Sequence, residues 1–418
     1  MKANISKLEQ PDTLPFGKRL ALCGLAMVVL LSSFNISVVN VALPDLANTF
    51  SVAMSGVQWL TISYLLAMTL LMPVAGMLGD RFGRKSLVLK GLGIFLVGTV
   101  GCVLSDNLVL LIAARAIQGV GAALLMSLAM SFVSDLVPSS KMGSVMGLLG
   151  TTSAVGTALG PVLGGVLISH FHWNTIFYVS VPVGILAYVL LSRLLPHSAS
   201  EVPSTSIAAS WVIQLQQNHH LLRSCMANFL VSAVIMSTMV VGPFYLSNGL
   251  QLSPEKVGLL MAIGPIVAAI AGAPAGQLTD RKGAAFVICA GLISMIVGCL
   301  SIALSAQSTS TLGYMASLVL ITAGYAMFQA ANNTAVMKNV KKSNKGITSA
   351  LLNFSRNSGL MTGASVMGWV YMTAAVRIYG EQNSSIFGFT ITFLLASGLV
   401  AFAMVGIFMR KRSSTDGD

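Results

Sequence analysis

Twelve apolar stretches of about 20 residues or more follow one another along the 418-residue chain. An α-helix needs roughly 20 residues to cross the ~30 Å hydrocarbon core of a bilayer. Only 9% of the residues are charged and 55% are hydrophobic, whereas about a quarter of a soluble domain is charged. We therefore expect an all-α integral membrane protein. The expected helices cover residues 20–43, 58–78, 86–104, 108–132, 142–168, 174–195, 221–246, 256–275, 284–306, 312–336, 347–376 and 385–409.

A short charged turn occurs twice. Gly76 to Lys85, GMLGDRFGRK, separate the second and third apolar stretches, and Gly276 to Gly283, GQLTDRKG, separate the eighth and ninth. Matched halves are typical of secondary transporters, whose substrate site lies near the middle of the membrane between the repeats. The turn residues that we expect to latch one side of the protein are Gly76, Gly79, Asp80, Arg81, Gly83, Arg84, Asp280 and Arg281.

Residues 196–220 interrupt the apolar pattern with Pro, Ser, His and Gln, and predict a cytoplasmic linker. They separate an N-terminal six-helix bundle with its tail, residues 1–195, from a C-terminal bundle with its tail, residues 221–418. Of the 24 lysines and arginines, only Lys256 and Arg377 fall in the loops of the other side. The positive-inside rule then predicts cytoplasmic termini in a multi-pass protein of the inner (cytoplasmic) membrane.

The turn motif G-x-L-x-D-R-x-G-R-K resembles the loop motif between the second and third helices of the major facilitator superfamily. The resemblance implies twelve transmembrane helices in two six-helix bundles that rock about a central site. It implies a transporter of a small molecule and not an enzyme, and two bundles suffice for transport within a monomer. The sequence contains no nucleotide loop, metal cluster or Ser/His/Asp arrangement, so we expect no cofactor, no metal and no nucleic-acid partner.

The fifth apolar stretch contains the pattern G-x8-G-x3-G-P-x2-G-G. Glycines four residues apart line one helix face and let a second backbone approach, while proline removes one hydrogen bond from the helix. The pattern resembles the antiporter motif of the drug:proton antiporters, the multidrug and metabolite efflux branch of the superfamily, and so implies efflux. Its residues are Gly147, Gly156, Gly160, Pro161, Gly164 and Gly165.

The fourth apolar stretch contains Arg115, with Gln118 on the same helix face. An arginine inside a membrane helix costs at least about 2.5–3.5 kcal/mol on insertion scales, and it therefore indicates a function by default. The surrounding sequence, LLIAARAIQGVGAA, resembles the fourth-helix motif of the superfamily. The resemblance implies that Arg115 couples proton movement to transport.

The first apolar stretch contains FNISVVNVALP, which resembles the L-D-x-T-x-x-N-x-A-L-P signature of drug:proton antiporters that typically have fourteen spans. Asn35 stands where the signature has aspartate. An amide does not exchange a proton near neutral pH, so Asn35 is a candidate for substrate binding and not for coupling. All carboxylates of the chain fall in tails, turns, loops or helix ends. If protons drive transport, Asp45 at the outer end of the first helix is the first carboxylate candidate.

Two arginines, Arg115 and Arg356, fall inside expected helices. They predict a positively charged cavity that favours an anionic substrate, whose expulsion from a cell with a negative interior gains about 2.3 kcal/mol per charge per 100 mV. Arg356 could instead be tied to backbone carbonyls, and each buried amide could link two helices. The residues expected at the cavity are Asn35, Asn40, Arg115, Gln118, Asn332, Asn353 and Arg356. Further polar candidates are Gln58, Tyr64, Asn228, Tyr325, Gln329, Asn333 and Asn357.

We therefore expect a secondary active transporter that exports a drug or an endogenous metabolite by alternating access, with protons as the coupling ion and the lipid bilayer as its surroundings. One alternative is a proton-coupled or facilitative importer of a small nutrient, because the missing aspartate of the first helix leaves the coupling open. A remote alternative from another class is a membrane sensor that does not transport.

Overall fold

The computed structural model describes residues 15–136, 142–195, 219–307, 310–338, 345–375 and 381–408. The helices of the N-terminal half are α1 (Phe16–Thr49), α2 (Met54–Phe82), α3 (Arg84–Val103), α4 (Leu108–Leu136), α5 (Met142–His170), α6 (Thr175–Tyr178) and α7 (Ser180–Leu194). Those of the C-terminal half are α9 (His219–Phe244), η1 (Tyr245–Gly249), α10 (Pro254–Lys282), α11 (Ala284–Gln307), α12 (Thr311–Lys338), α13 (Lys345–Thr362), η3 (Gly363–Met367), α14 (Gly368–Ala375) and α15 (Glu381–Phe408).

Eleven helical stretches among the described residues are long and apolar enough to cross a membrane. Helices α13, η3 and α14 follow one another without a break from Lys345 to Ala375 and form a twelfth rod of similar length. The all-α fold with twelve helices expected from the sequence is therefore confirmed. The expected linker lies outside the described residues, except that its last two residues, His219 and His220, begin α9.

The outside of the helices is apolar, as a bilayer requires. Ile270 is 71% exposed, Leu304 70% and Phe402 66%. An exposed apolar surface of this kind is unfavourable in water, whereas acyl chains cover it in a membrane. The polar residues that matter for function are therefore to be sought between the helices.

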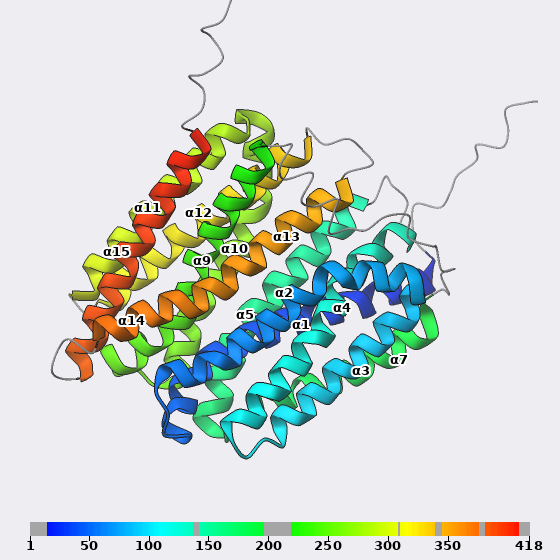
Figure 1. The fold of residues 1–418 in the computed structure, drawn as a ribbon, viewed down its shortest axis with the longest axis horizontal. Coiled ribbons are helices and arrows are strands. Elements are labelled where there is room, and N and C mark those ends of the chain that lie inside the picture. Colours follow the sequence, from blue (N-terminus) through cyan, green and yellow to red (C-terminus); the bar gives the residue numbers. More distant parts are fainter. Residues whose placement is uncertain are drawn as a thin grey trace, which may run out of the picture.

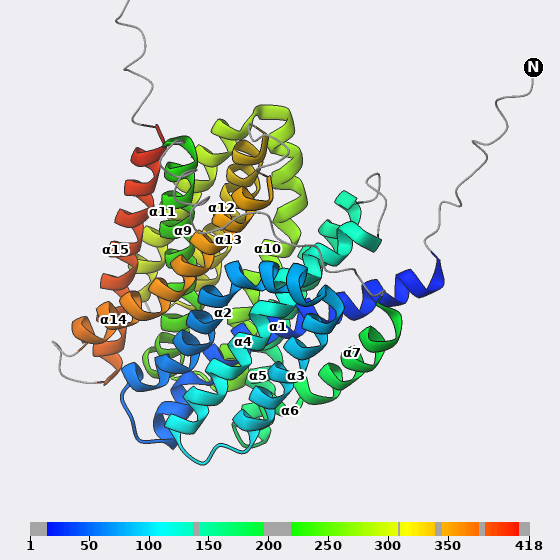
Figure 2. The same ribbon diagram turned by 45° about the vertical axis from the view of Figure 1, so that its right-hand side comes forward.

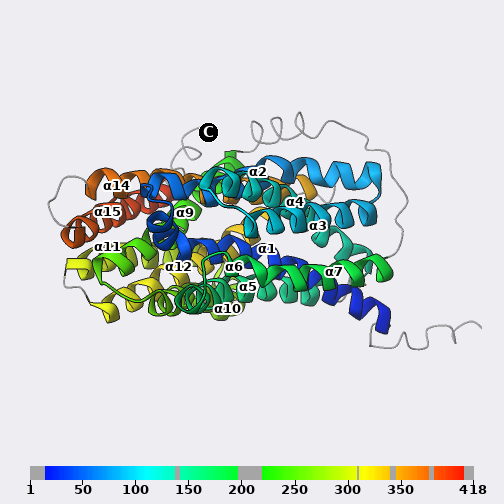
Figure 3. The same ribbon diagram turned by 90° about the horizontal axis from the view of Figure 1, so that it is seen from below.

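The helices form two bundles, α1–α7 and α9–α15, which are seen side by side in Figures 1 and 3. Figure 2 shows them after a turn about the vertical axis. Within the first bundle, α1 contacts α5, and α4 contacts both α2 and α3. Within the second, α11 contacts α12 and α15. The bundles meet where α5 contacts α10, α2 contacts α13 and α1 contacts α9. We call this boundary the seam.

Backbone geometry repeats between the halves. Among the described residues, those with positive φ are Ser51 and Gln251, at 52° and 54°, and Gly83 and Gly283, at 82° and 84°. The members of each pair are 200 positions apart in the sequence. Gly83 separates α2 from α3, and Gly283 separates α10 from α11. A left-handed residue between two helices favours glycine, which has no Cβ atom to clash with the backbone.

The charged turns are shorter than the sequence predicts. We expected the helices on either side of the first turn to end at residue 78 and to begin at residue 86, but α2 continues to Phe82 and α3 begins at Arg84. The prediction was wrong because charged residues in the last helical turn reach the interface without ending the helix. The two glycine breaks and the first described residues of α1 lie at one end of the helices, which we call the turn end. The loops at residues 50–53 and 250–253 lie at the opposite end.

Candidate functional site

The backbones of the two halves touch at the opposite end of the seam. A Cβ atom on Gly165 of α5 would lie 2.6 Å from the Pro254 carbonyl oxygen and 3.1 Å from the Cα atom of Gly258 in α10. A Cβ atom on Gly258 would overlap the Pro161 carbonyl. No side chain larger than hydrogen fits at either glycine while these helices remain in contact.

A second contact closes the same end. A Cβ atom on Gly368, the first residue of α14, would overlap the side-chain amide of Gln58 in α2. Gln58 is 3% exposed, so its polar group is buried against the other half. Its Nε2 atom has no hydrogen-bond partner among the described residues. Gln58 thus lies in the seam and not at the cavity described below.

The glycines expected to form the antiporter helix line two helix contacts. Cβ atoms on Gly156, Gly160 and Gly164 would lie 2.6 to 2.7 Å from atoms of Leu30, Val38 and Val41 in α1, with Ser37 closer still to Gly160. This face joins α5 to α1 inside the first half. Pro161 and Gly165 instead contact α10 across the seam. Gly147 belongs to α5, but its surroundings are outside the described residues. An antiporter role for this helix stays a prediction.

Arg115 is held inside the first half. Its Nε atom donates to the Leu60 carbonyl at 3.2 Å, and Nη2 donates to the Asn35 carbonyl at 3.0 Å. Nη1 donates to Oε1 of Gln118. The guanidinium carbon lies 4.2 Å from the ring centre of Tyr64, a cation–π distance. All these partners are neutral, so the charge is stabilised by dipoles and a ring.

The amides around Arg115 extend the network to two more helices. Gln118 Nε2 donates to Asn35 Oδ1 at 3.0 Å and to Thr99 Oγ1 at 2.8 Å. Asn35 Nδ2 donates to the Leu31 carbonyl at 3.0 Å and to Ser180 Oγ at 2.8 Å. The network therefore joins α1, α2, α3, α4 and α7.

This network separates Arg115, Gln118 and Asn35 from the cavity at which we expected them. All three side chains are 0% exposed. Every contact named for them lies within the first half. Their roles in substrate binding and proton coupling stay predictions, and in this conformation they link helices.

Two further predicted cavity residues also link helices. Asn40 Nδ2 donates to the Ile36 carbonyl at 3.2 Å, and its Oδ1 accepts from Thr61 Oγ1 of α2 at 2.9 Å. Asn332 Nδ2 donates to the Ser224 carbonyl of α9 at 3.4 Å, and Asn332 is 1% exposed. These contacts match the alternative interpretation, in which a buried amide links two helices by hydrogen bonds.

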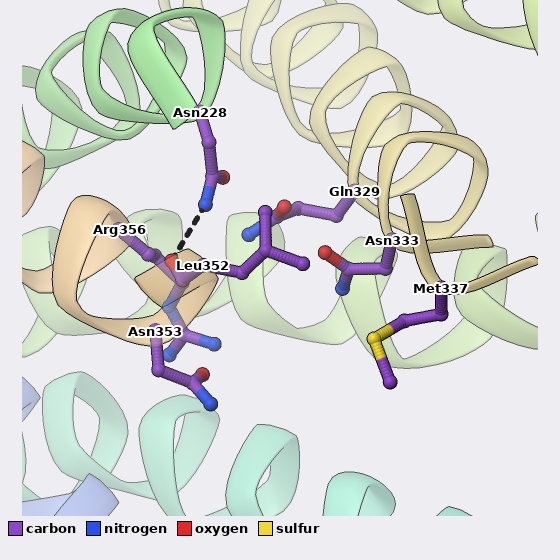
Figure 4. A pocket seen from close by; sticks show the side chains of 7 residues that line it. All are labelled: Asn228, Gln329, Asn333, Met337, Leu352, Asn353 and Arg356. Atoms are coloured by element: carbon purple, nitrogen blue, oxygen red, sulfur yellow. Dashed lines mark hydrogen bonds between the residues drawn. The ribbon is translucent and has the colours of Figure 1, made fainter. Parts of the chain in front are cut away.

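A polar cavity of about 130 Å³ lies in the C-terminal half, between α9, α12 and α13 (Figure 4). Figure 4 shows Asn228 on α9, three residues on α12 and Arg356 on α13, with side chains directed toward the space between the helices. The residues on α12 are Gln329, Asn333 and Met337. The lining residues are Asn228, Gln329, Asn333, Met337, Leu352, Asn353 and Arg356. Of the seven residues that the sequence analysis placed at the cavity, Asn353 and Arg356 line this one.

Three polar atoms of the lining residues have no hydrogen-bond partner among the described residues. They are Asn228 Oδ1, Gln329 Oε1 and Arg356 Nε. The other end of the Asn228 amide is occupied, since Nδ2 donates to the Leu352 carbonyl at 2.8 Å. An unpaired buried polar atom costs about 1–3 kcal/mol, so such a cluster indicates a place where water or a ligand binds.

The cavity lies beside the seam and on the turn-end side of the middle of the helices. At 1.5 Å per residue, Arg356 is about 17 Å along a rod of about 46 Å that begins at Lys345. Its neighbour Asn357 donates from Nδ2 to Met72 Sδ in α2 at 3.3 Å, across the seam. Asn333 and Asn353 are exposed at the mouth of the cavity. The cavity is thus open to the surroundings, whereas the opposite end of the seam is closed by backbone contacts.

The other predicted functional residues lie near the two ends of the helices. Asp45, in the last turn of α1 at the opposite end, is half-buried and interacts electrostatically with His172. Asp280 and Arg281 are exposed at the end of α10. Gly79 fits against Leu128 of α4, since a Cβ atom there would lie 2.5 Å from Leu128 Cδ2. The side chains of Asp80 and Arg81 and the surroundings of Gly76 are outside the described residues.

Sequence reasoning missed two lining residues, Met337 and Leu352. Both are apolar in helices full of apolar residues, so hydropathy does not distinguish them. Leu352 precedes Asn353, and Met337 follows Asn333 by four positions, which is one helical turn. A helical projection anchored on Asn333 could have found Met337.

Twelve helices in two repeated halves, with a polar cavity beside the seam, define a membrane transporter fold. The chain belongs to the Major Facilitator Superfamily, whose family model matches residues 25–364. It is accordingly a transporter of small molecules and not an enzyme.

Several relatives are similar to this chain at low identity. The riboflavin transporter RibZ of Clostridioides difficile is 26% identical and aligns over 94% of this chain and 98% of its own length. The multidrug efflux pump LfrA of Mycolicibacterium smegmatis is 27% identical over 84% of this chain and 80% of its own. The methylenomycin A resistance protein of Bacillus subtilis is 38% identical over 43% of this chain and 39% of its own.

Solved structures share the fold. A bacterial homologue of the human lysosomal transporter Spinster, in an inward-facing and unoccupied conformation, superposes with a TM-score of 0.78 at 16% identity. The match covers 95% of this chain and 97% of that one. The nucleoside transporter NupG superposes with a TM-score of 0.74 at 15% identity, over 94% of this chain and 100% of that one.

Proposed function

We propose that this protein exports a small organic molecule from the cytoplasm across a bacterial inner membrane by alternating access. The observation that carries the proposal is the position of α5. The helix that resembles the antiporter motif supplies Pro161 and Gly165 to the seam, where they contact Gly258. A motif at the surface where the two halves must part and close is placed to control alternation. The similarity to LfrA and to the methylenomycin resistance protein also supports efflux.

The conformation fits one step of such a cycle. The opposite end of the seam is closed at Gly165 and at Gln58, and the polar cavity lies on the turn-end side of the middle of the helices. With the turn end in the cytoplasm, as the distribution of lysine and arginine predicts, the cavity would load substrate from the cytoplasm. Closing the turn end and opening the opposite end would then release the substrate outside.

A second candidate function is uptake of a small nutrient. It is favoured by the similarity to RibZ, a riboflavin transporter, over almost the whole of both chains. Asn35 also leaves the first helix without the aspartate of the efflux signature. The two candidates use the same cavity and differ in the direction of net flux.

An untargeted comparison of small molecules in cells and in spent medium separates the two candidates. We expect a strain that lacks the gene to accumulate one compound inside, and a strain that overproduces the protein to release that compound into the medium. A medium component that only the deletion strain fails to consume would establish uptake and contradict export.

We further propose that protons drive export and that Asp45 carries them, because it is a partly exposed carboxylate at the opposite end of the first half. Asp45→Asn should lower uphill transport by at least about tenfold while leaving exchange down a gradient within about twofold, because an amide cannot carry a proton. Both rates are to be measured in proteoliposomes with an imposed pH gradient.

The matched control is Asp106→Asn, an exposed carboxylate between α3 and α4 at the same end. It removes the same charge and should leave both rates unchanged. Equal uphill transport by the two variants would exclude Asp45 from the coupling step.

A further inference from the structure

The cavity of Figure 4 carries a positive charge that the residues around it do not neutralise. Its charge comes from the guanidinium group of Arg356. Among the described residues, those that line the cavity include no carboxylate. The Nε–H group of Arg356 has no acceptor within the described part of the chain, so no backbone carbonyl accepts from that atom. An oxyanion that enters the cavity would supply both the missing charge and the missing acceptor.

Two buried acceptors face the same space. Asn228 is 1% exposed, and its Oδ1 atom has no described partner. Gln329 is half-buried, but its Oε1 atom is buried and also has no described partner. Both amides are oriented by their nitrogen atoms, since Asn228 Nδ2 donates to the Leu352 carbonyl at 2.8 Å and Gln329 Nε2 donates to Tyr325 Oη at 3.1 Å. A simple anion would leave these oxygens unpaired, whereas a ligand with O–H or N–H groups would satisfy them.

The size of the cavity limits what it encloses. Its volume of about 130 Å³ is well below the roughly 300–1,000 Å³ of a site that surrounds a whole drug-sized ligand. The cavity therefore holds one polar head group. The rest of the ligand would extend past Asn333 and Asn353, which are exposed at the mouth.

We infer that this cavity binds the head group of a small organic acid that has a hydroxyl or amide donor beside its carboxylate. The Arg356 guanidinium binds the carboxylate. A hydroxyl donates its single hydrogen bond to the side-chain oxygen of Gln329 or Asn228, and a primary amide can donate to both. A lipophilic cation is disfavoured at this position because it would face the guanidinium without a neutralising group. This inference rests on the proposed function only in taking the cavity as the site of the transported substrate.

The test uses the purified full-length protein in detergent and measures its thermal unfolding with millimolar mandelate, phenylacetate, mandelamide or benzyltrimethylammonium. Mandelate has a carboxylate and a neighbouring hydroxyl, phenylacetate lacks the hydroxyl, and mandelamide lacks the charge. We expect mandelate to raise the melting temperature of the protein most, and phenylacetate to raise it less. Mandelamide, which is uncharged, and benzyltrimethylammonium, which is a cation, should not raise it. Arg356→Gln should weaken mandelate binding at least about tenfold, as expected for a charged hydrogen bond.

Two variants separate binding from folding. Arg223→Gln removes the same charge from α9, at a residue that does not line the cavity, and should bind mandelate normally. Gln329→Leu removes one acceptor of the cavity, together with the Nε2 donor to Tyr325 on the same helix. It should weaken mandelate binding, because one acceptor for the hydroxyl is lost, and leave phenylacetate binding unchanged. A purely structural role would weaken both ligands equally.

The inference is wrong if no acid stabilises the protein, if mandelamide or benzyltrimethylammonium does so as well as mandelate, or if Arg356→Gln binds like Arg223→Gln. If Arg356→Gln does not fold, Gln329→Leu decides, and equal loss of both acids contradicts the inference. Binding in detergent does not depend on the direction of transport. An importer of organic acids would therefore be stabilised by mandelate but would not show export in the comparison of cells and medium. An exporter of cations would show export but would not be stabilised by mandelate.

Discussion

Transport should slow by at least about fivefold when Gly258 is replaced by leucine. A side chain at this position must enter the space of the Pro161 carbonyl, and Gly165 Cα lies 3.1 Å from where its Cβ atom would be. Overpacking of this kind costs about 1–3 kcal/mol, or more where two backbones must part. In the proposed cycle, only the state that is closed at the opposite end contains this contact, so that state would become about 5- to 150-fold rarer. A cycle that must pass through it should slow by at least about fivefold.

The control for Gly258→Leu is Gly272→Leu, on the same helix. A Cβ atom on Gly272 would meet nothing within 4 Å, so the larger side chain should be tolerated. Both variants are to be compared for membrane yield and for substrate flux in vesicles. Equal flux in the two variants would mean that the contact between α5 and α10 does not separate during transport.

Access to Gln58 provides an independent check of the same idea. Gln58 is 3% exposed, next to Gly368. With the 5 native cysteines replaced, Gln58→Cys should be protected from a membrane-impermeant thiol reagent applied at the opposite end. Adding Gly258→Leu should increase the labelling rate severalfold, since it opens that end. Unchanged labelling would contradict the proposed effect of Gly258→Leu.

Arg115→Gln should destabilise the protein before it alters any transport step. It removes donors from the carbonyls of Leu60 and Asn35 and from Gln118, all of them buried. Each unpaired acceptor costs about 1–3 kcal/mol, so a total loss on the order of 3–5 kcal/mol is expected. That corresponds to a decrease on the order of 10 °C in the apparent melting temperature for a unit of this size.

Arg193→Gln is the control for Arg115→Gln, because Arg193 is exposed at the end of α7 in the same half. It removes the same charge and should change the melting temperature by less than about 2 °C. A stable Arg115→Gln protein that exchanges substrate normally but fails to accumulate it would instead support the coupling role that the sequence motif implies.

The positions of the helices could be predicted from the sequence because hydropathy over about 20 residues reports directly on membrane helices. The expected stretch 312–336 corresponds to α12, Thr311–Lys338, and 284–306 corresponds to α11, Ala284–Gln307. Helix ends were less accurate where charged residues continue the helix, as at Phe82 in α2. Local polarity does not reveal whether a charged residue begins a loop or reaches the interface from the last helical turn.

The site was harder to predict because hydropathy does not determine the rotation of each helix. Asn332 and Asn333 are adjacent in the sequence, yet Asn332 bonds to α9 and Asn333 lines the cavity. Arg115 and Arg356 look alike as arginines inside apolar stretches. The first is surrounded by neutral partners from its own half, and the second has an unpaired Nε–H group in a cavity. Such partners come from distant parts of the chain, where a single sequence shows no pairing.

The central claim is export, and transport by everted membrane vesicles tests it most directly. The cytoplasmic face of such vesicles is outside, so an exporter moves its substrate inward. With the compound identified from cells and medium and an inside-acidic pH gradient, vesicles that contain the protein should accumulate the compound. Vesicles with Gly258→Leu should accumulate it at least about fivefold more slowly. Accumulation by right-side-out vesicles instead, with none in everted vesicles, would show that the protein is an importer.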